Sequence, residues 1–380
     1  MRVTHVITAL GTGGAEMMLL KLIHATVNQV SHQVVTLTEV DGPIAEMISK
    51  CGVDIHPLNL KGAASSLLAL PTIARQIRKT NPDLVQGWMY HGNIAATLTS
   101  VGAQARWPVS WAIRCTIGTF EERTRTRILL YGGIPLSHRA NAIFYNSEAA
   151  RAQHEAIGYV KRGEVLPNGF DVKQFSPRST TRAAVRNALG IPPDSFVVGY
   201  VGRLKPIKGL STLFEAFSAA GKHNASLIFV AAGKDMPRAA TSLRSSVEDI
   251  TSLGNRLFLL PERDDISSLY QAFDALALTS LAEGFPNVLG EAMASGLPCI
   301  STNVGACAEI IGNTGFLVPI GAANSVADAI ISLASMSETM RNDLGARARA
   351  RIVENFSIDK VAEKHLSAWD RLIHEARQLR

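Results

Sequence analysis

The chain has 380 residues, of which 47% are hydrophobic and 18% are charged, and this is enough apolar material for the cores of roughly two or three domains. No run of about 18 or more apolar residues occurs, which argues against a membrane-spanning helix, and the first residues are predicted to form a buried strand rather than a signal peptide. The four cysteines lie far apart without a C-x-x-C pair, which favours a reducing cytosol and argues against structural zinc.

The net charge of +6 is unevenly distributed along the sequence. Residues 1–170 contain 16 Lys+Arg and 11 Asp+Glu, whereas residues 171–380 contain 22 and 21. Because the chain lacks a dense basic patch interleaved with aromatic residues, nucleic acid is not an expected partner. The mild excess of Lys and Arg over Asp and Glu in the first half is better suited to an anionic membrane surface or a phosphate-bearing acceptor.

Short β-branched runs alternate with helix-length amphipathic segments, a pattern typical of parallel sheets covered by helices. The first half is expected to hold strands at residues 3–8, 33–38, 55–58, 84–87, 109–114 and 142–146. A predicted linker at 167–177 separates them from a second series at 196–202, 227–232, 257–260, 275–279, 299–301 and 316–318. The sequence therefore predicts an α/β protein with two similar sheets. The charged segment from Glu338 onward is expected to be helical, either as ordinary surface helices or with a helix that returns to the first domain.

A glycine-rich loop follows the first predicted strand and precedes a helix. Gly11, Gly13 and Gly14 would place backbone N–H groups and a helix N-terminus where an anion can bind. Glu16 occupies the position at which a dinucleotide-binding fingerprint requires its third glycine. An anion site, a tight turn without a ligand, and a nicotinamide site with Glu39 on the ribose therefore stay open at this point.

A second loop, between Gly202 and Gly209, carries three cations within six residues. Arg203 and Lys208 are positioned to bracket two phosphates, the first through a bidentate fork and the second as a point charge. The alternative is a solvated basic loop. The residue order of a P-loop is absent.

A third loop follows the strand at 275–279 and leads into a helix predicted over 286–295, which starts at Pro286 and ends before Gly296. Glu283 precedes this helix and Glu291 lies about two turns further on, so both can face one cleft. Such a pair can hold sugar and ribose hydroxyls while the amides of residues 285–289 meet a diphosphate. The alternative is that Glu283 caps the helix and Glu291 is solvent-exposed.

In this order, the motifs resemble those of the retaining glycosyltransferases of family 4 (group 1). The resemblance covers nearly the whole chain and rests on the run E-G-F-P-N-V-L-G-E-A-M-A-S-G-L-P from Glu283, the V-G-R-L and K-G pairs around Arg203 and Lys208, G-G-A-E at 13–16, Y-H-G-N around His91, N-S-E-A-A at 146–150 and P-N-G-F-D at 167–171. It implies the GT-B fold, in which two Rossmann-like, doubly wound domains face an interdomain cleft. The implied domains are an acceptor-binding domain at 1–170, joined by a helix at about 360–380, and a nucleotide-sugar-binding domain at 171–359.

The resemblance also implies roles for individual residues. Arg203 and Lys208 would neutralise the departing diphosphate, Glu283 would hold the donor sugar, and Glu291 would bind the ribose. His91 completes the implied catalytic set and is expected to orient a sugar hydroxyl rather than act as a general base, because no carboxylate partner is near it in sequence. The full expected donor-binding set is Gly13, Gly14, Arg203, Lys208, Glu283, Gly284, Phe285, Pro286, Asn287, Val288, Leu289 and Glu291.

The acceptor side is expected to include Glu16, Arg114, Arg123, Arg125 and Arg127. The arginine cluster also fits a solvated helix in which Glu121 pairs with Arg125, or a lipid-headgroup patch. No Asp-x-Asp motif is present, and two cations plus a helix N-terminus can replace a metal ion, so neither a metal nor another cofactor is expected. The segments 233–237 and 260–265 depart from the family pattern near the nucleobase, so UDP is expected only as the commonest donor.

The expected activity is that of a retaining, metal-independent hexosyltransferase in polysaccharide or glycoconjugate biosynthesis. It would move a sugar from a nucleotide-diphosphate sugar, UDP-sugar above all, to a glycan or lipid-linked acceptor, in the cytoplasm or at the inner face of the cytoplasmic membrane. The alternatives are a nucleotide-sugar epimerase of the same architecture and a non-catalytic nucleotide-sugar-binding protein. A dehydrogenase is disfavoured by the missing third glycine.

Overall fold

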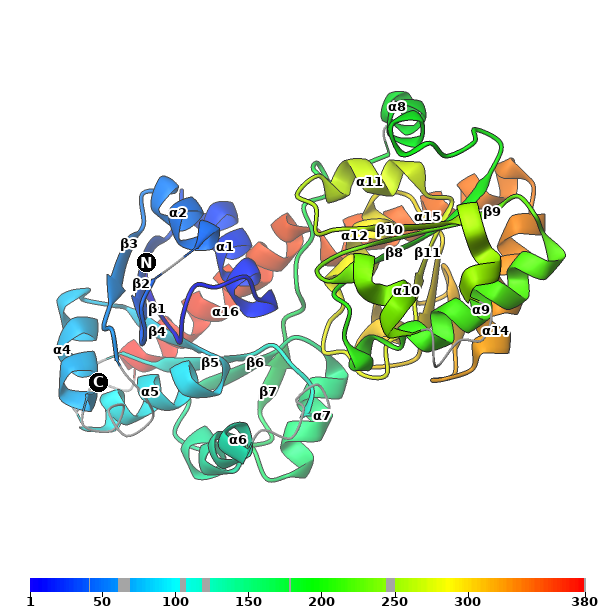
Figure 1. Cartoon of the computed structure of the whole chain (residues 1–380). Coiled ribbons are helices and arrows are strands. Elements are labelled where there is room, and N and C mark those ends of the chain that lie inside the picture. Colours follow the sequence, from blue (N-terminus) through cyan, green and yellow to red (C-terminus); the bar gives the residue numbers. More distant parts are fainter. Residues whose placement is uncertain are drawn as a thin grey trace. The chain divides into compact units, whose positions relative to one another are not determined.

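A computed structural model describes residues 1–40, 42–60, 69–102, 107–117, 124–177, 179–243 and 250–378. The chain divides into two compact units (Figure 1). Unit 1 comprises Met1–Gly169 and Ile358–Arg380, and unit 2 comprises Phe170–Ser357. Each unit contains one parallel sheet covered by helices, so the predicted α/β class with two similar sheets is confirmed.

Unit 1 is built on a seven-stranded sheet with the order β3-β2-β1-β4-β5-β6-β7. Its strands are β1 Arg2–Ile7, β2 Ser31–Thr36, β3 Asp54–Pro57, β4 Leu84–Trp88, β5 Val109–Ile113, β6 Ala142–Tyr145 and β7 Gly163–Val165. The strands β4, β5 and β6 are completely buried and mostly apolar, as expected for strands covered on both faces. The short strand β7 was not predicted.

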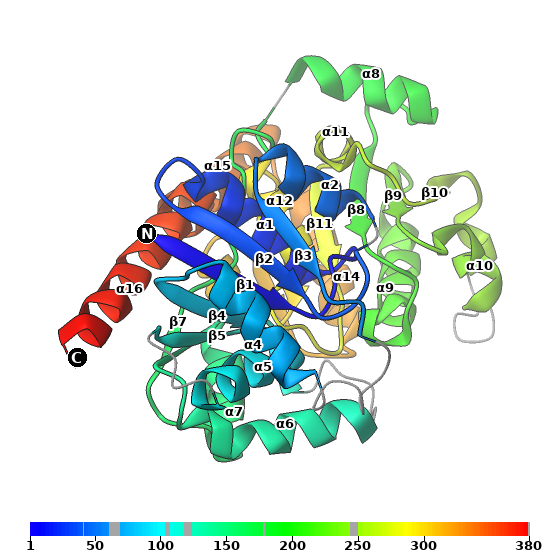
Figure 2. The ribbon, with the colours of Figure 1, turned by 90° about the vertical axis from the view of Figure 1, so that its left-hand side faces the viewer.

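Helices cover both faces of this sheet (Figures 1 and 2). One face packs against α1 Gly14–Thr26, α2 Pro43–Lys50 and α16 Ile358–Gln378. The other packs against α4 Leu70–Lys79, α5 Met89–Gly102, α6 Thr124–Ser137 and α7 Glu148–Ala156. The C-terminal helix α16 is part of the unit 1 core, because its Trp369 is fully buried and donates a hydrogen bond from Nε1 to Gln86 Oε1 at 2.7 Å.

Unit 2 is built on a six-stranded sheet with the order β10-β9-β8-β11-β12-β13. Its strands are β8 Phe196–Val201, β9 Leu227–Ala232, β10 Leu257–Leu260, β11 Ala275–Leu278, β12 Cys299–Thr302 and β13 Phe316–Val318. Its α-helices are α8 Ser179–Leu189, α9 Leu210–His223, α10 Ala239–Ser242, α11 Ile266–Ala272, α12 Asn287–Ala294, α13 Cys307–Ile311, α14 Ala323–Ser335 and α15 Glu338–Phe356. Short 3-10 turns lie at Pro206–Lys208, Met236–Arg238 and Ile250–Arg256. In the described part of the chain, no helix is both long and apolar enough to span a membrane.

The strand order places the candidate residues within each unit. In unit 1 the order reverses between β1 and β4, and in unit 2 it reverses between β8 and β11. Open parallel sheets bind ligands outside the carboxyl ends of the strands at such a switch point. Gly13 follows β1 and His91 follows β4, whereas Arg203 follows β8 and Glu283 follows β11. The expected site residues therefore come directly after the switch-point strands of their own unit.

Candidate functional site

The loop that carries Arg203 and Lys208 is tied to its neighbours by backbone contacts. Gly209 has φ +59°, and a Cβ added there would lie 2.0 Å from the carbonyl oxygen of Thr279. The Thr279 hydroxyl donates to the Gly209 carbonyl at 2.9 Å, and the Leu281 amide donates to the Ile207 carbonyl at 2.8 Å. Only glycine fits this close approach and left-handed conformation. Gly209 therefore brings Lys208 against the loop that follows β11.

Lys208 and Glu283 form an ion pair across this contact. Lys208 Nζ lies 2.6 Å from Glu283 Oε1, and the Ser280 hydroxyl donates to the same oxygen at 2.6 Å. The side chains are 22% and 11% exposed, respectively, so the pair lies between core and solvent. From the sequence, Lys208 and Glu283 were expected to have separate roles, and Ser280 was not among the expected site residues. In the structure, the three side chains form one cluster.

Glu283 does not cap helix α12. Pro286 occupies the N-cap position without a side-chain hydrogen bond to the helix, so the capping alternative is wrong for Glu283. Glu291 is half-buried rather than exposed. It acts on Tyr270, whose hydroxyl donates to the Val288 carbonyl at 3.2 Å and whose pKa is raised by burial first and by the Glu291 charge second. The alternative, in which Glu283 is the helix cap and Glu291 is solvent-exposed, therefore does not describe the structure.

The first turn of α12 offers part of the expected anion site. The Leu289 amide donates to the Pro286 carbonyl at 3.2 Å, so it is already engaged within the chain. The ring of Phe285 is only 7% exposed and stacks against Phe170 with centroids 6.0 Å apart. We conclude that the Phe285 side chain belongs to the core, which leaves its backbone as the part that can meet a ligand.

Arg203 and Tyr200 add to the electrostatics of this cluster. Arg203 is exposed and has no ion-pair partner among the described residues of unit 2. The Tyr200 hydroxyl is buried and lacks a hydrogen-bond partner in the described part of the chain. Burial raises the pKa of Tyr200, the Glu283 charge raises it further, and Arg203 opposes them. Both charged groups thus act on this hydroxyl. The sequence marked Tyr200 only as part of a strand and contained no signal for this interaction.

In unit 1, the glycine-rich loop folds around Glu16. Gly13 is the N-cap of α1 and makes no side-chain cap, and a Cβ added to it would lie 2.2 Å from Glu16 Oε2. Burial raises the pKa of Glu16, and a hydrogen bond from its own backbone opposes this shift. The carboxylate thus lies at the N-terminus of its own helix, where the positive end of the helix favours a negative charge. Gly14 has open space around it.

His91 lies in the first turn of α5. Met89, the first residue of this helix, has φ +57°, a left-handed conformation that is uncommon for a non-glycine residue. Position 92 requires a glycine for α5 to pack against β1, because a Cβ there would lie 2.2 Å from the Val6 carbonyl oxygen. Tyr90 points inward and bonds to His154 at 2.8 Å, whereas His91 is exposed. Partial burial of the imidazole lowers the pKa of His91, and no described carboxylate forms an ion pair with it.

Arg114, one of the residues expected on the acceptor side, is enclosed by the protein. Arg114 is buried and donates to the Leu166 carbonyl at 2.7 Å and to Asn168 Oδ1 at 2.6 Å. Burial lowers the pKa of its guanidinium to about 9. These contacts make Arg114 a structural clamp on the segment before Gly169, a correction to its expected place on the acceptor side.

Among the other arginines expected on the acceptor side, Arg127 is exposed on α6. Arg123 and the side chain of Arg125 lie outside the described residues, as does the expected pairing of Glu121 with Arg125.

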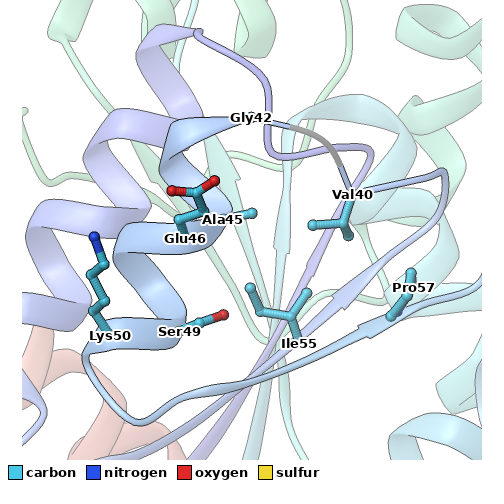
Figure 3. A pocket seen from close by; sticks show the side chains of 8 residues that line it. All are labelled: Val40, Gly42, Ala45, Glu46, Ser49, Lys50, Ile55 and Pro57. Carbon is cyan, nitrogen blue, oxygen red and sulfur yellow. The ribbon is translucent and has the colours of Figure 1, made fainter.

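Two further features lie apart from these residues. A hollow of about 730 Å³ in unit 1 lies between α2 and the edge strand β3 and is lined by Val40, Gly42, Ala45, Glu46, Ser49, Lys50, Ile55 and Pro57 (Figure 3). A cavity of about 680 Å³ in unit 2 lies at the amino ends of β8 and β11, where Asp274 pairs with Arg182 and Arg186. Neither includes an expected site residue. No group of three His, Cys, Asp or Glu side chains that could hold a metal occurs within the described ranges.

Family models match both units of the chain. Residues 13–169 match the "Glycosyl transferase 4-like domain" and residues 195–336 match "Glycosyl transferases group 1". The chain belongs to the group 1 glycosyltransferases. The predicted family is thereby confirmed, and Gly13, His91, Arg203 and Glu283 all lie within the matched ranges.

Curated relatives of this group 1 glycosyltransferase match it over part of its length. The UDP-Gal:alpha-D-GlcNAc-diphosphoundecaprenol alpha-1,3-galactosyltransferase of Escherichia coli is 31% identical over 204 residues, 53% of this chain and 52% of the relative. The N-acetyl-alpha-D-glucosaminyl L-malate synthase of Bacillus anthracis is 30% identical over 215 residues, 56% of this chain and 54% of the relative. The chain thus spans about half the length of the curated relatives it matches.

Solved structures of similar fold cover almost all of this glycosyltransferase. Anabaena HepE, in complex with UDP, superposes with a TM-score of 0.84 at 21% identity and covers 98% of this chain and 100% of its own. Sucrose-phosphate synthase from Thermosynechococcus elongatus gives a TM-score of 0.79 at 18% identity, covering 99% and 100%. At these identities the likeness shows the fold, which is the expected GT-B fold.

Proposed function

We propose that this protein transfers a hexosyl group from a nucleotide-diphosphate sugar, UDP-sugar first among them, to an acceptor hydroxyl with retention of the anomeric configuration. The observation that carries the proposal is the cluster of Lys208, Glu283 and Ser280, with Arg203 beside it, at the switch point of unit 2. The names of the E. coli relative and of the Anabaena complex, which contain UDP-Gal and UDP, favour uracil as the base of the donor nucleotide.

In this proposal the cations stabilise the leaving group. The bond between the anomeric carbon and the diphosphate oxygen breaks, the acceptor oxygen forms the new bond on the same face, and its proton passes to a phosphate oxygen. Arg203 and Lys208 offset the charge that develops on the diphosphate, together with the first turn of α12. Because these groups supply positive charge, we propose that transfer needs no divalent cation.

The carboxylates and His91 would position the sugars. Glu283 is held in place by Lys208 and Ser280, and this fixed orientation suits a group that accepts hydrogen bonds from donor-sugar hydroxyls. Glu291, two turns along α12, would accept from the ribose. His91 would orient a sugar hydroxyl, because no described carboxylate is paired with it to support general-base action.

We further propose that the acceptor is a glycan or a lipid-linked glycan and that the enzyme works in the cytoplasm, in peripheral contact with an anionic membrane. The name of the E. coli relative includes diphosphoundecaprenol, which supports a lipid-linked acceptor. The excess of Lys and Arg in unit 1 supports an anionic partner.

Binding and product analysis test the proposal. A panel of UDP-, GDP- and ADP-sugars is screened by thermal shift, and the best donor is then offered with extracted lipid-linked glycans. NMR of the product gives the anomeric configuration, and EDTA should leave the rate unchanged. Inversion would contradict the retaining mechanism, and loss of transfer in EDTA that Mn²⁺ or Mg²⁺ restores would contradict the metal-free one. Conversion of the donor without acceptor would instead identify an epimerase, and donor binding without turnover would identify a binding protein.

A further inference from the structure

Helix α6 of unit 1 presents an apolar stripe to solvent. Ile128 is 67% exposed and Tyr131 is 50% exposed, and Gly132 and Pro135 on the same helix are exposed as well. Their spacing of i, i+3, i+4 and i+7 places all four on one side of the helix. Adjacent exposed apolar side chains of this kind mark an interaction site more often than isolated ones do.

The opposite side of α6 is fixed to the rest of unit 1. The Tyr159 hydroxyl donates to the Leu130 carbonyl at 2.8 Å. A Cβ added to Gly133 would lie 2.6 Å from the same hydroxyl, so the helix is seated closely. Leu130, Gly133 and Ser137 are buried. The stripe therefore faces away from the core because of how α6 is packed.

Positive charge accompanies this stripe. Unit 1 contains 21 Lys+Arg and 15 Asp+Glu, whereas unit 2 contains 17 of each, so the whole net charge of +6 belongs to unit 1. Arg127 precedes the stripe, Arg139 follows it, and both are exposed. Neither has an ion-pair partner among the residues that the structure describes. Apolar side chains framed by unpaired cations match a bilayer surface that carries anionic headgroups.

The size of the stripe disfavours a protein partner. The 14 residues of α6 rise about 21 Å, and a helix is about 10 Å wide, so the exposed face covers roughly 200 Å². A standard protein interface needs about 800 Å² from each partner. A bilayer has no such requirement, because a few inserted side chains and several cations are enough for reversible binding.

We propose that the α6 stripe, defined as Ile128, Tyr131, Gly132 and Pro135, together with Arg127 and Arg139, is the docking surface for an anionic lipid bilayer. This inference deepens the proposed function, on which it rests, by naming the surface that would meet the membrane of a lipid-linked acceptor. Helix α6 follows β5, so its first turn starts from the carboxyl edge of the unit 1 sheet, where open sheets bind ligands. Docking through α6 brings that edge close to the headgroups.

Vesicle co-sedimentation of the full chain tests the proposal. Vesicles of phosphatidylcholine with about one-third phosphatidylglycerol are compared with phosphatidylcholine alone, for the wild type, Ile128→Asp and Ile320→Asp. Ile320 is a matched control, since it is an apolar side chain of unit 2 that is 53% exposed. We expect Ile128→Asp to lower the partition coefficient at least about tenfold, since burial of an exposed Ile in the interface is replaced by a charge. Ile320→Asp should bind like the wild type, and binding should weaken with salt.

Three results would overturn the inference. These are failure of the wild type to bind anionic vesicles, equal binding of the wild type and Ile128→Asp, or a dimer without lipid that Ile128→Asp abolishes. Tyr131→Asp provides a second test if Ile128→Asp fails to fold. Binding of UDP-sugar is measured in parallel on each variant. Donor binding without vesicle binding would refute this inference and leave the proposed transferase intact, whereas vesicle binding without donor binding would refute the transferase alone.

Discussion

Acidification should destabilise unit 1 selectively, because a chain of neutral histidines is buried in it. Trp88 Nε1 donates to His5 Nδ1 at 3.1 Å, so the His5 proton is on Nε2, which lies 3.0 Å from His32 Nδ1. His32 must then carry its proton on Nε2, 2.9 Å from the Thr26 hydroxyl, which donates to the Leu22 carbonyl at 2.6 Å. Every hydrogen bond points the same way. A proton added to either ring removes an acceptor and breaks the chain.

The size of the effect follows from the pKa values. Burial lowers the pKa of His32 to about 4, with the N-terminal amino group adding to this, and burial also lowers the pKa of His154 to about 4. His5, which faces His32 and His365, and His365, which faces Arg114, are shifted in the same direction. An unfolded histidine has a pKa of about 6.5, so stability is complete above that pH and falls as the pH drops toward 4. At pH 5 the loss is about 2 kcal/mol per histidine, or about 4 kcal/mol for His32 and His154 together.

The distribution of aromatic residues provides the assay. All four tryptophans, Trp88, Trp107, Trp111 and Trp369, belong to unit 1. Urea unfolding followed by tryptophan fluorescence therefore reports unit 1, and hydrogen exchange reports unit 2, whose single histidine is the exposed His223. We expect the unit 1 transition to weaken between pH 7 and pH 5, and His154→Gln to remove about 2 kcal/mol of that change while His223→Gln removes none. An unchanged tryptophan transition, or an equal loss in unit 2, would refute the reasoning.

Three further perturbations test the site and its scaffold. Lys208→Ala should lower the transfer rate by a factor of about 10²–10³, the effect typical of losing one well-placed charge-stabilising group. In a double-mutant cycle, the effects of Lys208→Ala and Glu283→Gln on the transfer rate should be non-additive, because the two side chains are in contact. Lys205→Ala, an exposed lysine of the same loop, is the control, and an equal loss of rate there would contradict the assignment. Asp274→Ala should lower the free energy of unfolding by about 3–5 kcal/mol in urea titrations, since it leaves the buried Arg186 without its carboxylate; a loss below about 1 kcal/mol would show that the pair is unimportant. Gly209→Ala should reduce UDP-sugar affinity in calorimetry, because its Cβ would lie 2.0 Å from a backbone oxygen and displace the loop. Wild-type affinity in that variant would show that the close approach does not matter.

The pattern of apolar residues along the sequence was sufficient to predict the α/β class and most strands of both sheets. The strands at 227–232, 257–260 and 316–318 have the bounds that the sequence predicted, and the other predicted strands differ by two residues or fewer at either end. The central strands, such as β4, β5, β9 and β11, are buried along their whole length, so their apolar runs are nearly continuous. Strand β7 was missed because its three half-buried residues, Gly163–Val165, contain too little pattern to detect.

Local motifs indicated which residues follow the switch-point strands but not how their side chains meet. Lys208 and Glu283 are 75 residues apart in sequence, and their contact depends on the left-handed backbone of Gly209. The buried hydroxyl of Tyr200 depends on the surrounding loops in the same way. Arg114 illustrates the opposite error, since a basic residue after a strand was interpreted as a ligand contact and is instead enclosed by the segment leading to Gly169.

The interrupted sequence of unit 1 has a consequence for synthesis on the ribosome. Unit 2 is an insertion between Gly169 and Ile358, so it emerges complete while unit 1 still lacks α16. Until α16 has emerged from the ribosome, the apolar face that receives Trp369 and Leu372 has no cover from that helix. The domain that begins first is therefore the last to finish folding, and a premature stop shortly before residue 358 would leave a complete unit 2 attached to an unfinished partner.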